Sequence, residues 1–377
     1  MASLSHRPLL ARACLTENRL LKRSWANKVI VMMKILICLT VCFFLSTGTN
    51  AQDLKADLDT LVNGFYNRQQ FSGSILVARK GTVLLHKAVG YRNVEQKLWN
   101  DTNTVHQIAS ITKTFTAQLV LKLHEKGKLN INDPLNRYFP DYPNGEKIRL
   151  THLLSHTSGI FDYTKDTLFM NHEIRHPSTR GQLLALFRNK PLLFEPGSKY
   201  SYCSSGYVLL GLIIEKVTGL SYDRAIRKHI TRPLRMHATG FDFKNSRNPK
   251  KATGYVDFPK EGSQAAPIVD ATASFSAGSM FSTTPDLYRY CRALNQYQLV
   301  KQSLQQQAQT PVFRFGYGWV IDQIGGKKRI FHDGGIDGAT CIVNRIPDDE
   351  ICIIILNNYE SPFIYEMSRA IIDLLHQ

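Results

Sequence analysis

The chain of 377 residues carries 47 lysines and arginines against 30 aspartates and glutamates, a formal net charge of +17 at neutral pH. The basic residues are dispersed, and no finger, RNP-like or basic-helix motif accompanies them, which argues against a nucleic-acid-binding protein. Seven cysteines are too few for a small disulfide scaffold. No repeat, low-complexity tract or linker divides the sequence, so we expect one large domain or two closely packed lobes.

The N-terminal segment has the layout of a secretory signal peptide. Met33-Lys34 gives a charged start, residues 35–45 are largely apolar, and small residues lead up to Ala51. We therefore predict a signal peptide region at 1–51 and a mature domain at 52–377. The apolar run is short for a membrane-spanning helix, which leaves an uncleaved anchor as the minor alternative. The prediction implies export from the cytoplasm, to a periplasm or to the cell exterior.

The stretch at 1–31 is basic and has no readable apolar period. Either translation starts at Met32 or Met33, or the signal peptide has a long basic start. Removing residues 1–51 takes away seven basic residues and one acid, so the net charge falls from +17 to +11. This excess fits a solvated surface and would also suit association with an anionic cell envelope.

Hydrophobic patterns in the mature region predict a mixed α/β protein of the α+β type. The predicted elements, in chain order, are a helix at 54–65, strands at 71–79 and 82–91 joined by a Lys80-Gly81 turn, a mostly helical stretch at 110–299, strands at 330–331, 339–344 and 351–356, and a helix at 364–374. Strands at both ends of the chain indicate a sheet assembled from distant segments. A large helical lobe would be inserted into it, with a site between the two parts.

Four cysteines remain in the mature region. Two of them, Cys341 and Cys352, flank the turn Ile346-Pro347-Asp348-Asp349 and could face one another across a hairpin. Two buried thiols are the favoured interpretation.

The sequence Ser110-Ile111-Thr112-Lys113 is the first candidate for chemistry. A serine and a lysine three residues apart lie on the same face of a helix, so an uncharged lysine amine can take the serine's proton. The positive end of the helix dipole would favour an oxyanion nearby. Taken alone, the pattern fits a capped surface helix better.

Two further segments carry polar groups at expected turns. Tyr202 lies in a hydroxyl-rich turn just before the apolar run 208–214, and a phenol beside a lysine ammonium can have a lowered pKa and act as a general base. Taken alone, the residue fits a buried tyrosine with a satisfied hydroxyl better. His332-Asp333-Gly334-Gly335 follows a strand, and its imidazole or imidazolium and its glycines could border a substrate. A simple strand-end turn is the alternative there.

Together and in this order, these segments resemble the penicillin-recognising serine hydrolases, in the branch of class C β-lactamases, D-alanyl-D-alanine carboxypeptidases and related esterases. The resemblance covers nearly all of the mature chain. Its other matching blocks are His106-Gln107-Ile108-Ala109, Asp133-Pro134-Leu135 with Tyr138-Phe139-Pro140, Leu153-Leu154-Ser155-His156-Thr157-Ser158-Gly159-Ile160, Phe194-Glu195-Pro196-Gly197, Ala277-Gly278-Ser279-Met280 and Leu356-Asn357-Asn358. It implies a β-lactamase/transpeptidase-like fold, with an antiparallel sheet flanked by the N- and C-terminal helices.

The resemblance also implies roles for single residues. Ser110 would be the acylated nucleophile, Lys113 its activator and Tyr202 a proton shuttle. The backbone N–H groups of Ser110 and Gly335 would form the oxyanion hole, and His332-Asp333-Gly334 would take the place of the family's Lys-Thr-Gly or His-x-Gly strand motif. The block around His156 would be structural. No cofactor or metal is implied, and the partner would be a small-molecule or peptidoglycan-derived peptide substrate.

Two positions depart from the family pattern. Ser204 stands where an asparagine is usual, and its hydroxyl cannot offer an amide N–H to an acylamino side chain. Asp333 stands where threonine or serine is common, and an acid pointing into the cleft would repel a substrate carboxylate by about 1 kcal/mol or more. Both changes weaken the case for an efficient β-lactamase and leave esters, amides and amine-bearing peptides open.

Two other classes of function compete with this interpretation. His172-Glu173-Ile174-Arg175-His176 matches the H-E-x-x-H zinc pattern, which needs both imidazoles on one face of a helix. Pro177 follows at once and disfavours helical geometry before it, so a zinc hydrolase is the weaker hypothesis. The segment could instead form a flap over the cleft. A catalytically inactive binding module with the same fold is the second alternative.

Overall fold

A computed structural model describes residues 53–376, of which residues 58–376 form one compact unit. The predicted signal peptide at 1–51 and both proposed start sites lie outside the described residues. Within the described part, no helix has the length and apolar character needed to cross a membrane.

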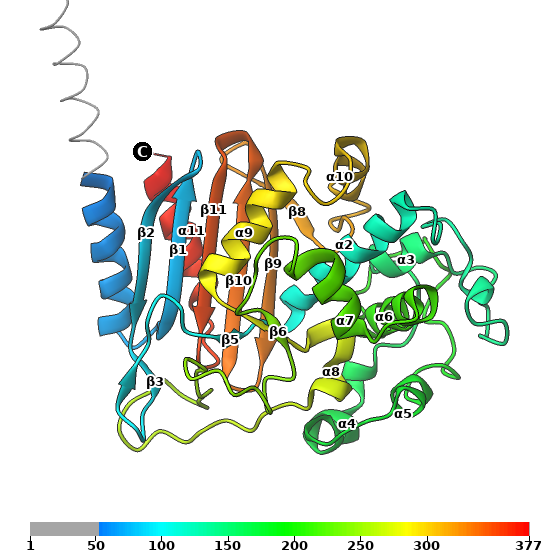
Figure 1. The fold of residues 1–377 in the computed structure, drawn as a ribbon, viewed down its shortest axis with the longest axis horizontal. Coiled ribbons are helices and arrows are strands. Elements are labelled where there is room, and N and C mark those ends of the chain that lie inside the picture. The colour runs from blue at the N-terminus through cyan, green and yellow to red at the C-terminus, as the bar shows by residue number, and fades with distance from the viewer. Residues whose placement is uncertain (1–52, 377) are drawn as a thin grey trace, which may run out of the picture. The chain divides into compact units, whose positions relative to one another are not determined.

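The centre of the fold is a six-stranded sheet in the order β2-β1-β11-β10-β9-β8 (Figure 1). Its strands are β1 (Gly73–Arg79), β2 (Thr82–Val89), β8 (Val320–Ile324), β9 (Lys327–Ile336), β10 (Ala339–Ile346) and β11 (Ile351–Asn357). Every neighbouring pair is antiparallel, and β1 pairs with β11 although more than 270 residues separate them, Gly73 lying opposite Asn357. The prediction of an antiparallel sheet assembled from both ends of the chain is confirmed.

Turn chemistry sets the register at the first hairpin. Lys80 and Gly81 both have positive φ angles, of 50° and 77°, which is the geometry of a two-residue type I′ turn. Arg79 therefore lies opposite Thr82. This confirms the hairpin predicted from Lys80-Gly81.

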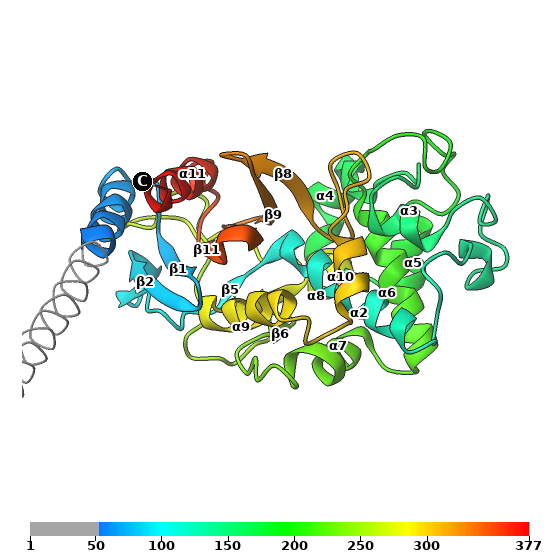
Figure 2. The ribbon, with the colours of Figure 1, turned by 90° about the horizontal axis from the view of Figure 1, so that it is seen from above.

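Helices cover both faces of the sheet (Figure 2). Helix α11 (Ile364–Leu375) packs on β10 and β11, and α9 (Thr284–Asn295) packs on the opposite face against β1 and β11. Residues 58–67 are helical, with Leu58, Val62 and Phe65 buried as the periodicity predicts. The flanking helices expected from the sequence are thus present.

The helical lobe lies between β2 and β8 in the sequence, as predicted. Its helices are α2 (Thr112–Glu125), α3 (Leu150–Leu154), α4 (Thr167–Asn171), α5 (Arg180–Ala185), α6 (Ser204–Thr218), α7 (Tyr222–Ile226), α8 (Ala271–Gly278), α9 and α10 (Gln302–Ala308). Helix α2 is buried on nearly all sides because it packs against α6 and α8 and also stacks Phe115 on Tyr290, with ring centroids 4.0 Å apart. This central helix carries Lys113 and follows Ser110 directly.

Short elements that the sequence patterns do not predict complete the fold. They are β3 (Tyr91–Asn93), β4 (Leu98–Trp99), β5 (His106–Gln107), β6 (Gly240–Phe241) and β7 (Met280–Ser282). The five-residue edge strand β8 is also missing from the prediction. The small sheet β5-β7-β6 matters for the site because β5 ends just before the short 3₁₀ helix η1 (Ala109–Ile111).

The cysteines Cys341 and Cys352 do not face one another. Register places Cys341 opposite Leu356 and Cys352 opposite Arg345. Both thiols are free and buried, so the favoured interpretation is confirmed and the hairpin-bridge alternative is wrong.

Candidate active site

Ser110 and Lys113 form the closest polar pair of the candidate site. Ser110 lies in η1, one turn before Lys113 in the first turn of α2. The Lys113 Nζ is 3.0 Å from the Ser110 Oγ and donates a second hydrogen bond to the Ala277 carbonyl oxygen at 2.9 Å. The carbonyl fixes the amine, so the nitrogen can exchange a proton with the serine hydroxyl.

Burial changes the chemistry of the lysine. Its side chain is 1% exposed, and no carboxylate forms an ion pair with it among the residues that the structure describes. Desolvation lowers the pKa of Lys113 to about 8, with small opposing effects from Asp162 and other groups. At pH 7 about a tenth of the amine is therefore uncharged, far more than for an ordinary lysine, and proton abstraction from a serine requires this form.

The backbone around Ser110 faces the edge of the sheet. Ala109, the preceding residue, has a φ of 42°, a conformation that non-glycine residues rarely adopt. The position that a Cβ of Gly334 would occupy lies 3.0 Å from the Ser110 backbone nitrogen. Gly335 follows on β9, has open space beside its Cα and lines the same cleft as Ser110. This places the two backbone segments of the expected oxyanion hole together.

Tyr202 lies beside this pair, two residues before α6. The Lys113 Nζ is 4.9 Å from the centroid of the Tyr202 ring. Desolvation nevertheless raises the pKa of Tyr202 well above its ordinary value. The sequence-based expectation of a lowered pKa is therefore wrong, because burial of the phenol outweighs its polar neighbours. The phenol is protonated in the free protein.

The His156 side chain packs against the ring of Tyr202. Its imidazole stacks on the Tyr202 ring with centroids 4.3 Å apart, and its Nδ1 accepts a hydrogen bond from the Cys203 backbone N–H at 3.0 Å. The side chain is buried, and burial lowers its pKa well below the ordinary value. This neutral ring fits the structural role expected for the block around His156.

His332 is also neutral. Burial lowers its pKa to about 4, and its Nδ1–H donates to the Asp333 carbonyl oxygen at 2.6 Å. The imidazole lies near Tyr202 and Phe315, with centroid distances of 6.4 and 5.8 Å. Of the two forms considered from the sequence, the structure supports the imidazole and not its cation. Because Nδ1 carries the proton, Nε2 presents a lone pair.

The two departures from the family pattern lie in different places. Ser204 is the first residue of α6 and lines the cleft beside Ser110. The Asp333 carboxylate instead accepts a hydrogen bond at 2.7 Å from the Tyr365 hydroxyl of α11. The predicted repulsion of a substrate carboxylate depended on Asp333 pointing into the cleft, and this contact directs the side chain toward α11.

The cleft at Ser110 has a volume of about 120 Å³ and a largely apolar wall. Met170, Ile174, Val269 and Ile336 contribute to this wall. The segment 164–177, which sequence analysis considered as a flap, supplies two of these side chains. It is tied to the turn between β9 and β10 by an ion pair of 3.1 Å between Arg175 and Asp337. The ion pair itself has no signal in the sequence, because its two residues are 162 positions apart.

The H-E-x-x-H pattern lacks the helix that a zinc site needs. Helix α4 ends at Asn171, and residues Glu173–Arg175 form a separate 3₁₀ turn, η4. Within residues 53–376, no three histidine, cysteine or acidic side chains lie close enough to hold a metal ion. The two imidazoles therefore do not share one helical face, which removes the basis of the zinc hypothesis.

Comparison with known proteins agrees with this geometry. The family model described as "Beta-lactamase" matches residues 56–376. This chain belongs to the beta-lactamase family. Penicillin-binding protein 4* of Bacillus subtilis (strain 168) is 31% identical over 84% of this chain and 74% of its own length. The family includes penicillin-binding-protein-like, amidase and esterase members, and its members are serine hydrolases.

Two solved structures show the same fold. A penicillin-binding protein from Bacillus halodurans is 26% identical, with a TM-score of 0.74, over 84% of this chain and 98% of that one. A D-stereospecific amidohydrolase from a Streptomyces species is 26% identical, with a TM-score of 0.68, over 80% of this chain and 92% of that one. The β-lactamase/transpeptidase fold expected from the sequence is confirmed, and the protein is a hydrolase of this family.

Gly334 offers a test of the packing that places Ser110. An alanine Cβ there would lie 2.6 Å from the Ile108 carbonyl oxygen and 2.8 Å from the Cys341 Sγ. Gly334→Ala should lower stability by about 1–3 kcal/mol and lower turnover about 100-fold, because η1 must move. Thermal melting and ester hydrolysis measure both effects. Gly335→Ala is the control for folding, since no atom lies within 4 Å of its Cβ position. Wild-type stability and turnover in Gly334→Ala would contradict the packing described here.

Proposed function

We propose that this protein is an exported serine hydrolase that works through an acyl-enzyme at Ser110. The uncharged Lys113 amine takes the hydroxyl proton as the Ser110 Oγ attacks a substrate carbonyl carbon. The backbone N–H groups of Ser110 and Gly335 hold the oxyanion that forms. The carbon–leaving-group bond then breaks, and the leaving group receives a proton through the Tyr202 phenol. A water molecule then attacks the acyl carbonyl carbon in the same way, which breaks its bond to the Ser110 Oγ and releases the carboxylic acid.

One observation carries this proposal: the 3.0 Å contact between the Lys113 Nζ and the Ser110 Oγ. The low pKa of the lysine, about 8, supports the direction of proton transfer. Tyr202 begins as a phenol, so it acts as a proton donor and relay between the leaving group and the lysine. His332 borders this relay with the lone pair of its Nε2. No step requires a cofactor.

The cleft favours an amide or ester with an uncharged, partly apolar acyl group. Its wall is apolar around Met170, Ile174 and Val269, while Ser204 leaves room and offers a hydroxyl. Cell-wall D-amino-acid peptides, esters and β-lactams all remain compatible with the machinery. The likeness to a D-stereospecific amidohydrolase supports including D-amino-acid amides in this set.

We also propose that the mature protein is 52–377 and acts outside the cytoplasm. The charged, apolar and small-residue pattern of 33–51 supports cleavage after Ala51. The remaining charge of +11 supports contact with an anionic cell envelope.

A panel of acyl donors tests the substrate class. We expect purified 52–377 to hydrolyse a short-chain nitrophenyl ester and a D-alanine amide in preference to the L-alanine amide. We expect slower turnover of a penicillin, because Ser204 cannot supply the amide N–H that an acylamino side chain would use. Comparable kcat/KM values for the D and L amides, or a penicillin as the best donor, would overturn this order. Turnover of none by a folded protein would favour a catalytically inactive binding module.

A further inference from the structure

Basic residues occur along the whole chain, but one segment holds an unusual share of them. Residues 222–251 contain nine lysines and arginines against two aspartates, a net charge of +7 in 30 residues. The predicted mature protein, 52–377, has a net charge of +11. More than half of the excess positive charge therefore lies in less than a tenth of the mature chain.

Most cations of this segment are exposed and unpaired. The segment runs through α7 and the π-helical turn η5 (Arg227–Thr231) and continues past β6. Seven of its basic side chains are exposed and take part in none of the ion pairs formed within residues 53–376; they are Arg224, Arg227, Lys228, Arg232, Arg235, Lys244 and Arg247. We call these seven residues the basic face. No large apolar side chain of 222–251 is exposed beside them.

The two halves of the basic face lie close together. Arg227 of η5 lines the same groove as Asp242 and Asn245, which places the turn η5 beside the loop that carries Lys244. Helix α7 and strand β6 are also neighbours in both ribbon views (Figure 1 and Figure 2). The exposed cations on either side of β6 therefore belong to one surface.

The C-terminal end of α2 adds further positive charge next to η5. The Lys122 Nζ donates to the His229 carbonyl oxygen at 3.0 Å. Burial lowers the pKa of His229, and so do the neighbouring charges of Lys126, Lys228 and Lys122. Cations held this close together repel one another, and an anionic partner would relieve that repulsion.

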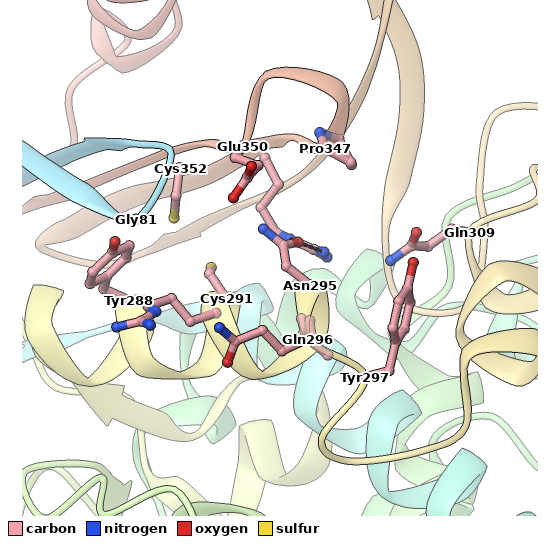
Figure 3. A pocket seen from close by; sticks show the side chains of 13 residues that line it. Gly81, Tyr288, Cys291, Asn295, Gln296, Tyr297, Gln309, Pro347, Glu350 and Cys352 are labelled. Atoms are coloured by element: carbon pink, nitrogen blue, oxygen red, sulfur yellow. Dashed lines mark hydrogen bonds between the residues drawn. The ribbon is translucent and has the colours of Figure 1, made fainter.

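The lack of an ion pair does not by itself make a cation available to a partner. Arg345 lines a cavity between α9 and the turn that joins β10 to β11 (Figure 3). Its side chain is 1% exposed and its Nε donates to the Asn295 Oδ1 at 3.2 Å, so the protein itself encloses this cation. The cations of the basic face differ because all seven are exposed to solvent.

We propose that the basic face docks on the anionic phospholipid surface of a bilayer, where its guanidinium and ammonium groups contact the lipid phosphates. This inference extends the proposed contact with the cell envelope and rests on the proposed export. Because the basic face exposes no large apolar side chain, the protein lies on the bilayer without inserting into it. Binding is then electrostatic and weakens as salt screens the charges.

The groove next to Arg227 favours a flat anionic surface over a single polyanionic strand. The carboxylates of Asp223, Asp242 and Asp270 line this groove. A strand lying in the groove would meet these acids, whereas a bilayer would touch only the exposed side chains around it. A soluble polyanion is the competing partner, and the experiment includes one.

Co-sedimentation of the purified 52–377 protein with lipid vesicles tests the proposal. We expect binding to vesicles that contain phosphatidylglycerol to be at least about tenfold tighter than binding to pure phosphatidylcholine vesicles. Binding should be lost at about 1 M NaCl, where the screening length falls to about 3 Å. The readout does not depend on turnover, so failure of this proposal and failure of the proposed catalysis at Ser110 are separate results.

Two pairs of charge reversals locate the binding surface. Lys228→Glu together with Arg232→Glu should weaken binding to anionic vesicles by about tenfold or more, because each basic residue near such a surface contributes about fivefold. Arg235→Glu together with Lys244→Glu should give a similar loss. All four side chains are exposed, so thermal melting should stay close to that of the wild type.

A matched control separates the basic face from the net charge of the protein. Lys97→Glu together with Lys199→Glu reverses two exposed charges outside the basic face and should leave most of the binding intact. Equal losses in the control and in the two test pairs, or no binding of the wild type to anionic vesicles, would overturn the proposal. Soluble polyphosphate that binds the wild type more tightly per phosphate than the vesicles do would also overturn it and assign the basic face to a polyanion.

Discussion

Replacing Ser110 with alanine is expected to lower turnover of every substrate by about 10⁴-fold or more. The Ser110 Oγ lies 3.0 Å from the Lys113 amine, and Ser110 lines the same cleft as Gly335. Removing it eliminates the covalent step, whereas the residual rate from binding and oxyanion contacts remains. Steady-state ester hydrolysis measures the loss.

The stability of this variant provides its control. Within residues 53–376 the one hydrogen bond of the Ser110 hydroxyl is the one it accepts from Lys113, and its neighbours in η1 are buried, so thermal melting should change little. Ser204→Ala is a matched serine variant in the same cleft. It should reduce turnover far less than Ser110→Ala, because the hydrogen bonds of the Lys113 amine within the described residues go to Ser110 and Ala277 and not to Ser204. Equal losses in the two variants would contradict a nucleophile at Ser110.

Lys113→Met is expected to lower turnover by about 10²- to 10⁴-fold, the contribution of a general base. In the wild type, kcat/KM should rise with pH through an apparent pKa near 8, the value to which burial lowers the pKa of Lys113. The sign follows from the mechanism. Below this pH the amine is an ammonium and cannot accept the serine proton, and above it the amine is free. The pH dependence of ester hydrolysis shows this rising limb.

Lys113→Met should stay folded, and its kcat/KM should no longer rise with pH near pH 8. Methionine is similar in volume and removes the cost of a desolvated charge, so thermal stability should be kept or increased. Lys122→Met on the same helix is a matched control, because Lys122 is partly exposed and donates to the His229 carbonyl oxygen far from Ser110 in the sequence. A rising limb that persists in Lys113→Met would assign the titration to another group.

Sequence patterns predicted best those features that residue type and local chain geometry determine. Lys80-Gly81 predicts the first hairpin because both residues must adopt positive φ angles. The spacing of Ser110 and Lys113 predicts their contact because one helical turn separates them. Both features depend on a few neighbouring residues, so a linear pattern contains them. The oxyanion segment, by contrast, was assigned through the family resemblance, since Ser110 and Gly335 are far apart in sequence.

Features that depend on three-dimensional burial were missed or misjudged. A lysine neighbour suggested a lowered pKa for Tyr202, but burial raises it, and the packing against His156 cannot be read from the sequence. Strand β8 was missed because five residues at a sheet edge, two of them Asp322 and Gln323, carry too little alternation. Its ion pair to Arg329 on β9 becomes visible only in the structure.

Intact-mass measurement of the purified 52–377 protein after brief incubation with an acylating ester or a fluorophosphonate tests the proposed mechanism most directly. We predict a single covalent adduct in the wild type, mapped to Ser110 by peptide analysis and absent from Ser110→Ala. An adduct that persists in Ser110→Ala would move the nucleophile elsewhere. No adduct in a folded wild-type protein, with any probe, would contradict an acyl-enzyme mechanism.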